Sequence, residues 1–263
     1  MNNQEFILYE QKGRIAKITI NRPDKANACN ISMLKSIYQY LINADDDEKV
    51  KCILIKSTGQ RFFSAGYDTK EILGAPEKAT QIIEWGRRIN ETIVLMKKPV
   101  ITQIQGIAIG FGVMVILASD LRVFADRPVD ELYMRLPELE ISAFPQTGAT
   151  LLPLLGLGLN YAKNMLFTAD KFGVEDLKNI NFPAKIFPLD QLESETLNFA
   201  KKIIKYQTEF IFFTKTMLRI MNKAYIKSCF DLEDECGKVA YNPKKKTMRE
   251  LDDFIKSLNE KYP

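Results

Sequence analysis

The pattern of hydrophobic and polar positions predicts strands and helices that alternate along the chain. Residues 15–20 alternate apolar and polar side chains, as a half-buried strand does, and we expect them to pair with residues 6–9 as a hairpin or as two neighbouring strands. Residues 33–44 carry apolar side chains at helical spacing behind Ser32, the expected N-cap, and residues 50–56 form the next strand. A strand, a helix and a strand in this order favour parallel pairing with a right-handed crossover.

The same periodicities predict further elements towards the C-terminus. We expect a last strand at residues 182–187 and helices at residues 81–95, 148–155, 160–167, 174–179, 192–205, 209–225, 232–239 and 248–258. No apolar run reaches the roughly 18 residues that a membrane span requires, and no N-terminal signal segment is recognisable. We therefore expect a cytoplasmic protein without a membrane partner.

One stretch joins a short strand to an apolar helix through a turn that contains several glycines. Residues 100–104 have the β-branched character of a buried strand, Gly106, Gly110 and Gly112 follow, and residues 113–118 are apolar without a break. A helix that starts at such a turn leaves unpaired backbone N–H groups, which can hold an anion or a developing oxyanion. Taken alone, the glycines are also consistent with nothing more than tight backbone packing.

A second strand, at residues 50–56, leads to another turn of small residues. Residues 64–66 read Ser-Ala-Gly, and Asp68 is placed to cap a helix that continues through residue 72. Two such turns at one cleft would suit a polarised carbonyl, because each turn could donate one backbone N–H to its oxygen.

Composition narrows the chemistry that is available. The 263 residues, 46% hydrophobic and 27% charged, fit one large globular domain, and a formal net charge of +4 is too slight to indicate nucleic acid. The four cysteines show no C-x-x-C spacing and are expected as reduced thiols. The basic run at residues 244–246 is expected as a solvated loop, with binding of an anionic phosphate as the alternative. Because the chain has no histidine, proton transfer must use carboxylates, lysine, tyrosine, cysteine or water.

Several motifs together resemble the crotonase superfamily, the group of enoyl-CoA hydratases and isomerases. They cover nearly the whole chain in order: Asn21-Arg22-Pro23 with Asn27-Ala28, Phe63 to Glu71, Lys97 to Asp120, Leu136-Pro137-Glu138, Pro145 to Thr150, Leu166 to Ala169 and Ala184 to Pro188. The resemblance implies an α/β fold, a spiral of repeated ββα units, with residues 1–190 as the core and residues 191–263 as a helical region for cleft cover and trimerisation. It also implies a homotrimer or a dimer of trimers, and a coenzyme A thioester as the substrate without a metal or further cofactor.

The resemblance further implies an oxyanion hole formed by the backbone N–H groups of Tyr67 and Phe111, where the phenylalanine side chain would narrow or reshape the acyl pocket. Family hydratases place two glutamates around a water. Met114 occupies the position of the first glutamate in this chain, whereas Glu138 matches the second, with Glu140 as a nearby alternative. The other positions that resemble substrate-binding ones are Lys25, Ala26, Ala65, Gly66, Asp68, Lys70, Gly110, Met114, Pro137, Phe254 and Lys256.

One carboxylate beside an oxyanion hole is sufficient for a proton shuttle. We therefore expect isomerisation of a 3-enoyl to a 2-enoyl thioester, with Glu138 as the single acid and base. The alternatives are hydration, hydrolysis or decarboxylation of acyl groups on coenzyme A or a carrier protein, and a non-catalytic subunit that binds acyl-CoA.

Overall fold

The part of the chain that the structure describes forms two β-sheets and belongs to the α/β class, as expected. The computed structural model describes residues 5–73, 75–220, 223–242 and 247–262. The larger sheet has the order β1 (Ile7–Lys12), β2 (Ile15–Ile20), β3 (Cys52–Ser57), β5 (Val100–Ile104), β7 (Leu121–Ala125) and β10 (Lys185–Phe187). The smaller sheet has the order β4 (Phe62–Ser64), β6 (Ile107–Ile109), β8 (Tyr133–Arg135) and β9 (Phe172–Gly173).

Successive units of the chain place one strand in each sheet and then add a helix. The larger sheet takes β3, β5 and β7, and the smaller sheet takes the strand that follows each of them, β4, β6 and β8. All pairings are parallel except β1 with β2 and β8 with β9. This repetition confirms the expected spiral of ββα units and the parallel pairing of β2 with β3.

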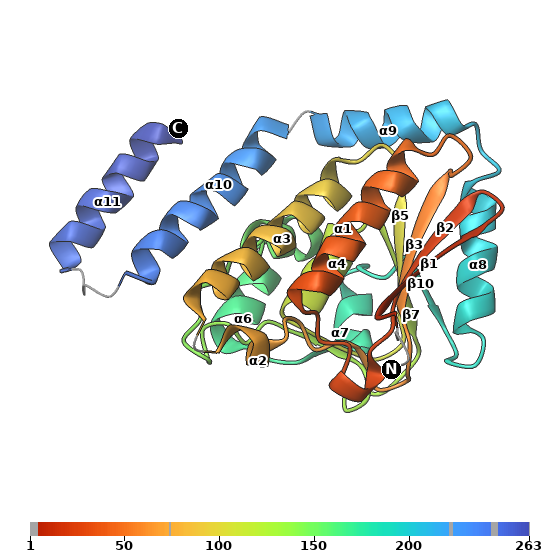
Figure 1. Cartoon of the computed structure of the whole chain (residues 1–263), viewed down its shortest axis with the longest axis horizontal. Coiled ribbons are helices and arrows are strands. Elements are labelled where there is room, and N and C mark those ends of the chain that lie inside the picture. The colour runs from red at the N-terminus through yellow and green to blue at the C-terminus, as the bar shows by residue number, and fades with distance from the viewer. Residues whose placement is uncertain (1–4, 74, 221–222, 243–246, 263) are drawn as a thin grey trace.

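Helices cover both faces of the larger sheet. On one face lie α1, α3 and α4, whereas α8 packs against the other face, on β3, β5, β7 and β10 (Figure 1). The helices are α1 (Ile31–Asp46), α2 (Thr69–Ile72), α3 (Pro76–Leu95), α4 (Phe111–Ala118), α5 (Leu151–Leu157), α6 (Leu159–Thr168), α7 (Val174–Asn179), α8 (Leu192–Ile203), α9 (Thr208–Ile220), α10 (Lys223–Ala240) and α11 (Met248–Lys261), with a 3-10 turn at Pro23–Lys25.

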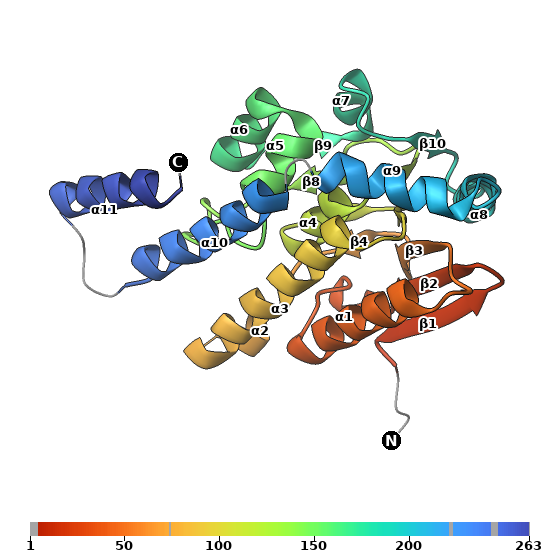
Figure 2. The same ribbon diagram turned by 90° about the horizontal axis from the view of Figure 1, so that it is seen from above.

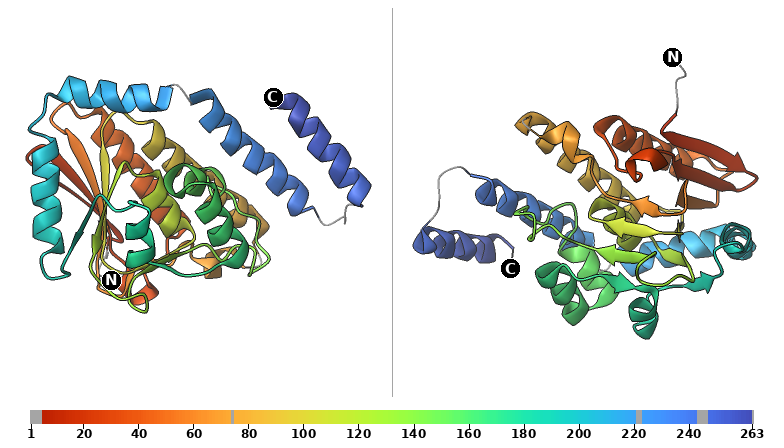
Figure 3. Two further views of the ribbon diagram at one scale, coloured as in Figure 1. Left: turned by 180° about the vertical axis from the view of Figure 1, so that it is seen from behind. Right: turned by 90° about the horizontal axis from the view of Figure 1, so that it is seen from below.

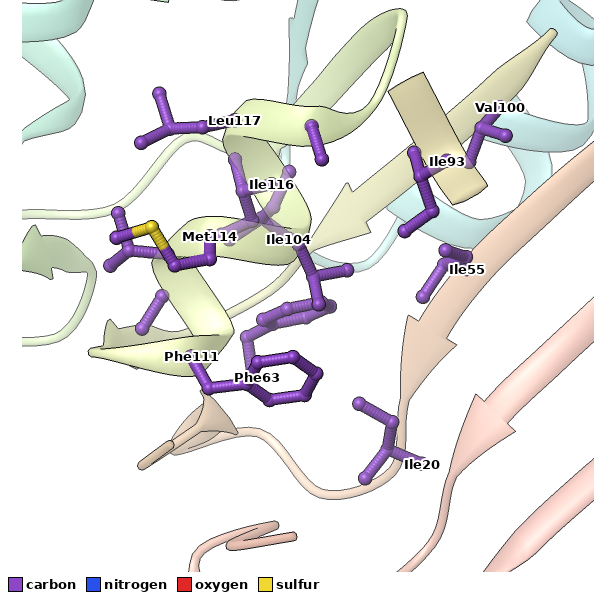
Figure 4. Close-up of a cluster of buried hydrophobic side chains, with 14 of the residues drawn as sticks. Ile20, Ile55, Phe63, Ile93, Val100, Ile104, Phe111, Met114, Ile116 and Leu117 are labelled. Carbon is purple, nitrogen blue, oxygen red and sulfur yellow. The ribbon is translucent and has the colours of Figure 1, made fainter. Parts of the chain in front are cut away.

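The core lies between the sheets and these helices, and α4 is buried along its whole length. Figure 4 shows its residues Phe111 and Ile116 among apolar side chains from the surrounding strands. At the other end of the chain, α10 and α11 extend away from the two sheets (Figures 2 and 3). None of the helices in the described part of the chain is both long enough and apolar enough to cross a bilayer.

Three expectations about element boundaries were wrong. Asn30, and not Ser32, caps α1, because its Oδ1 accepts the N–H of Met33 at 2.9 Å. The glycine-bearing turn after β5 contains the short strand β6, which is held between β4 and β8. The helix expected at residue 148 begins only at Leu151, because Gly148 has a φ of +94° and its N–H donates to a side chain of α10.

The C-terminal helices also differ from the expected ranges. A helix was expected at residues 209–225, but α9 ends at Ile220 and α10 begins at Lys223 and continues to Ala240. Residues 221–222 and the basic run at residues 244–246 lie outside the described residues. The division of the chain at residue 190 stays a prediction, and α8, which follows it, packs directly on the larger sheet.

Candidate active site

The candidate site lies where three neighbouring strands of the smaller sheet end. Strands β4, β6 and β8 are parallel and adjacent, so their carboxyl ends meet at one edge of the sheet. Tyr67 follows β4, Phe111 follows β6 and Glu138 follows β8. Three consecutive ββα units therefore each deliver one of the residues that the sequence singles out as catalytic.

The backbone N–H of Tyr67 points away from the segment that pairs with it. Tyr67 forms an isolated parallel bridge with Cys29, in which Cys29 donates its N–H to the carbonyl of Gly66 at 2.8 Å and accepts the N–H of Asp68 at 2.9 Å. Because successive N–H groups of an extended chain alternate in direction, the Tyr67 N–H lies on the side opposite Cys29.

The backbone N–H of Phe111 lies close to this turn. Phe111 is the first residue of α4, so its N–H has no acceptor within the helix. Gly66 directly precedes Tyr67 and has a φ of +93°, and a Cβ at Gly66 would lie 3.4 Å from the Phe111 nitrogen and 2.9 Å from the carbonyl oxygen of Ile109. Glycine at position 66 thus allows the two amide-bearing turns to meet.

The start of α4 packs tightly against the end of β4. A Cβ at Gly112 would lie 2.7 Å from the carbonyl oxygen of Ser64 and 2.9 Å from its Cβ. The Ser64 hydroxyl donates to the carbonyl of Asn27 at 2.9 Å and accepts the N–H of Gly66 at 3.1 Å. Both turns are therefore fixed by contacts between backbone and small side chains.

Glu138 presents a carboxyl group next to the turn that contains Phe111. A Cβ at Gly110 would lie 3.4 Å from Oε1 of Glu138. The other oxygen, Oε2, is buried and has no hydrogen-bond partner among the described residues. Burial raises the pKa of the Glu138 carboxyl from its ordinary value of 4.5 to about 7. This pKa suits a group that takes up and releases a proton near neutral pH.

The neighbouring Glu140 occupies a different environment. Its side chain is exposed and forms an ion pair with Arg135 at the end of β8, whose Nε donates to the carbonyl of Ala169. Glu138 is thus the carboxyl that lies beside the glycine turn, and Glu140 is engaged at the surface. The catalytic role of Glu138 stays a prediction.

Met114 lies one turn into α4 and is 1% exposed. Its N–H donates to the carbonyl of Gly110 at 3.1 Å. In Figure 4 its thioether extends to the side of α4 opposite Ile55 and Ile93. A buried thioether at this position offers no group that transfers a proton.

Some of the expected substrate-binding residues lie close together in the structure. Ala65 donates its N–H to the carbonyl of Ala26 at 2.9 Å, which joins the first loop to the turn after β4. Lys25 and Lys70 are exposed on these same segments. Phe254 and Lys256 lie on α11, beyond α10 and apart from these segments within one chain (Figure 1). For all of these residues, contact with a substrate stays a prediction.

Asp68 has a supporting role in the structure. Its Oδ1 accepts the N–H of Lys70 at the start of α2, and its Oδ2 pairs with Arg22 at 2.7 Å. The side chain of Asn27, 1% exposed, accepts the N–H of Arg22 and donates to the carbonyls of Thr58 and Phe62. Arg22 and Asn27 belong to the first motif of the sequence, which assigns neither of them a function. Both hold the first loop against the turn after β4.

Sequence reasoning also missed the residues that fix the Tyr67 side chain. The Tyr67 hydroxyl lies 3.3 Å from Oγ1 of Thr147, and the carbonyl of Thr147 accepts Nδ2 of Asn90 at 2.8 Å. From α10, the buried carboxylate of Glu233 accepts the N–H groups of Gly148 and Thr150 and the Thr150 hydroxyl. These contacts join segments far apart in sequence, so no local pattern could have revealed them.

Comparison with known proteins agrees with this architecture. A family model described as enoyl-CoA hydratase/isomerase matches residues 10–250. Crotonyl-CoA hydratase of Syntrophomonas wolfei is 30% identical over 203 residues, which is 76% of each protein. Short-chain-enoyl-CoA hydratase of Clostridium acetobutylicum is 27% identical over 206 residues, which is 75% of each protein.

Solved structures share the fold. An enoyl-CoA hydratase from Mycobacterium avium subsp. paratuberculosis superposes with a TM-score of 0.79 at 21% identity, over 91% of this chain and 92% of that one. An enoyl-CoA hydratase from Bacillus anthracis superposes with a TM-score of 0.77 at 22% identity, over 96% and 97%. Because the family model matches most of this chain, the chain belongs to the enoyl-CoA hydratase/isomerase family of the crotonase superfamily.

Proposed function

We propose that this family member isomerises 3-enoyl thioesters to 2-enoyl thioesters with Glu138 as the only acid and base. The observation that carries the proposal is the carboxyl of Glu138, which is partly buried beside the glycine turn and has a pKa of about 7. Met114, in the helix that follows this turn, provides no second carboxyl. The substrate is a coenzyme A thioester, and the reaction uses only the thioester and groups of the chain.

In the proposed reaction, the thioester oxygen accepts the N–H groups of Tyr67 and Phe111. Glu138 removes a proton from the α-carbon, and the electron pair of that C–H bond moves towards the carbonyl to give an enolate. The two N–H groups stabilise the negative charge on the oxygen. The enolate then collapses as the γ-carbon takes the proton back from Glu138, so that the double bond shifts from the β,γ to the α,β position and the carboxylate is restored.

The names of the relatives favour hydration as a second candidate. The matched proteins from Clostridium acetobutylicum and Syntrophomonas wolfei are both named hydratases. Hydration by a single carboxyl would have to orient the attacking water and protonate carbon with the same group, so we expect it to be slow. Met114 is therefore the residue that separates the two reactions.

The decisive experiment compares isomerisation of 3-hexenoyl-CoA with hydration of 2-butenoyl-CoA. We expect isomerisation to dominate and Glu138→Gln to lower it by roughly 10²- to 10⁴-fold, whereas Glu140→Gln, the matched control, leaves it close to wild type. Met114→Glu should raise hydration by at least about tenfold, and Met114→Gln should not. Isomerisation that survives Glu138→Gln would refute the proposal.

Two further outcomes identify the remaining alternatives. Decarboxylation or hydrolysis relies mainly on the oxyanion hole, so turnover of malonyl-type or 3-hydroxyacyl thioesters that tolerates Glu138→Gln would favour those reactions. Tight binding of acyl-CoA without turnover of any thioester would indicate a non-catalytic subunit.

We also propose that the coenzyme A moiety lies along Lys25, Ala26, Ala65 and Lys70. The hydrogen bond from Ala65 to Ala26 puts both lysine-bearing segments side by side, and their exposed ammonium groups offer charge for phosphates. A Lys25→Ala and Lys70→Ala double variant should weaken binding of butyryl-CoA by about tenfold but leave binding of the shorter butyryl-pantetheine unchanged.

The assembly that we propose is a homotrimer or a dimer of trimers. It is supported by α9, where Phe210, Phe213, Met217 and Leu218 are 63–75% exposed, an apolar surface that association would cover. Sedimentation of wild type as a trimer or hexamer, with Phe213→Glu shifted towards monomer, is the expected result. A wild-type monomer at micromolar concentration would contradict it.

A further inference from the structure

We propose that the side chain of Tyr67 closes the acyl pocket and restricts this protein to thioesters of short acyl chains. The inference rests on the proposed function for the position of the thioester, and it assigns to the Tyr67 side chain a role in specificity that is separate from that of its backbone N–H.

The side chain of Tyr67 points to the same side as that of Phe111. The rings of Tyr67 and Phe111 stack with centroids 4.9 Å apart and an interplanar angle of 19°, so the two residues of the proposed oxyanion hole send their side chains to the same side. Phe111 is 2% exposed and the Tyr67 side chain is partly buried, which makes this side largely apolar. In the proposed position of the thioester, an acyl chain that extends to this side meets the two rings.

The hydroxyl of Tyr67 occupies space beside Gly86 of α3. A Cβ at Gly86 in α3 would lie only 1.9 Å from the Tyr67 hydroxyl oxygen, so the end of the tyrosine fills the space that a side chain at position 86 would take. Glycine destabilises the interior of a helix, and this contact is a physical reason for its presence. The ring of Tyr67 therefore bridges from the turn after β4 to α3.

Contacts with neighbouring residues hold the Tyr67 side chain in this position. The hydroxyl contacts Thr147, which is 3% exposed, has a φ of +65° and is held by Asn90. Burial raises the pKa of the Tyr67 hydroxyl well above its ordinary value; the hydrogen bond with Thr147 opposes this shift, and Cys29, Glu138 and Glu233 add to it weakly. The hydroxyl is thus neutral and anchored within electrostatic range of the proposed base. Swinging the ring away to admit a long chain would break the stack with Phe111 and the contact with Thr147 together.

The test is the affinity of the protein for butyryl-CoA and octanoyl-CoA, measured by calorimetry so that no turnover is required. Wild type should bind octanoyl-CoA no more tightly than butyryl-CoA. In Tyr67→Ala the backbone N–H stays, and the preference for octanoyl-CoA over butyryl-CoA should rise by at least about tenfold, because each additional buried methylene favours binding by about fourfold. Tyr67→Phe is the matched control, since it keeps the ring and should keep the wild-type ratio.

Two further variants guard against misfolding and address the contact with α3. Tyr67→Leu removes the ring with less loss of packing and should change the ratio in the same direction as Tyr67→Ala. Gly86→Ala should displace the ring, and Gly86→Ala combined with Tyr67→Leu should bind butyryl-CoA better than Gly86→Ala alone.

The proposal is overturned if wild type prefers octanoyl-CoA by about tenfold, or if the ratio in folded Tyr67→Ala and Tyr67→Leu stays within about threefold of wild type. Failure of the isomerase reaction with intact binding would refute the proposed function alone, because the ratio of affinities does not depend on turnover. Absence of binding to either thioester would refute both.

Discussion

The rings of Tyr67 and Phe111 stack on each other, with centroids 4.9 Å apart at an interplanar angle of 19°, although the two residues follow different strands of the smaller sheet. The contact links the two turns whose backbone N–H groups we assign to the oxyanion hole. It therefore couples the stability of the fold to the geometry of the candidate site.

This stack should be measurable as a coupling energy. In a double-mutant cycle of Tyr67→Leu and Phe111→Leu, we expect the free energies of unfolding to be non-additive by about 1 kcal/mol, since offset aromatic pairs contribute this much beyond their buried area. Urea denaturation provides the measurement. Tyr9→Leu in the larger sheet, combined with Tyr67→Leu, is the control and should be additive. Additive effects for both pairs would show that the stack contributes nothing.

The pH dependence of activity follows from the raised pKa of Glu138. Because the base must be ionised to remove a proton, kcat/KM should rise with pH and level off above about 7, where the carboxyl of the free enzyme is deprotonated. Initial rates of isomerisation between about pH 5 and pH 9, which span the ordinary range of a glutamate and the raised pKa, test this. A plateau that already begins near pH 5 would mean that Glu138 titrates like an exposed carboxyl, or that another group is the base.

The same pKa predicts how stability changes with pH. Since the folded pKa is about 7 and the ordinary value is 4.5, the folded state binds more protons than the unfolded state between these values, and stability falls as the pH rises through them. The fall should amount to at most about 3 kcal/mol, and Glu138→Gln should lack it. Chemical denaturation at about pH 5 and pH 8, which cover most of this range, compares the two proteins. The same change in unfolding free energy between the two pH values for wild type and Glu138→Gln would contradict a raised pKa of Glu138.

The close approach of Gly112 to Ser64 gives a prediction that joins stability and activity. Gly112→Ala would place a Cβ 2.7 Å from the Ser64 carbonyl oxygen, so the start of α4 must shift. We expect a loss of about 1–3 kcal/mol in stability and a fall in activity of at least about tenfold, because the Phe111 N–H moves with α4. Gly13→Ala is the control: its φ is +61°, but a Cβ there would meet nothing within 4 Å beyond its chain neighbours, so stability should fall while activity is retained. Full activity in Gly112→Ala would argue against Phe111 as a donor.

Local patterns were sufficient to predict the elements that carry the site. The strand at residues 100–104 and the helix at residues 174–179 have the expected bounds, because β-branched runs and helical spacing are properties of neighbouring residues. Asp68 caps α2 as expected, for the same reason. Local patterns failed where pairing between segments decides the structure, as for β6, which is too short to be recognised without its neighbours β4 and β8.

The environment of the candidate site could not be derived from local sequence. Glu138 faces the glycine turn whereas Glu140 pairs with Arg135 at the surface, and this difference depends on how the segment after β8 folds. The support of the Tyr67 hydroxyl depends on Thr147, which comes from a distant part of the chain. Gly86 alone is noticeable in the sequence, as a glycine inside an otherwise regular amphipathic helix. The reason for a glycine at this position becomes clear only from its contact with Tyr67.

A buried lysine fastens α9 to the core. Lys215 is 8% exposed, and its Nζ donates to Asp120 at 2.6 Å and to the carbonyls of Ile93 and Lys98. Asp120 also accepts the N–H of Val100 at 2.7 Å, so the ion pair lies at the start of β5. Lysine is rarely buried unless it is paired in this way.

Removing this lysine should destabilise the protein strongly. Lys215→Met should lower the free energy of unfolding by about 3 kcal/mol, because Asp120 and two carbonyls lose their donor. Asp120→Asn combined with Lys215→Met should recover part of the loss, since it removes the charge left without a partner. Lys201→Met on the exposed surface of α8 is the control and should stay within about 0.5 kcal/mol of wild type in urea denaturation. Equal effects of Lys215→Met and Lys201→Met would mean that α9 is held by its apolar contacts alone.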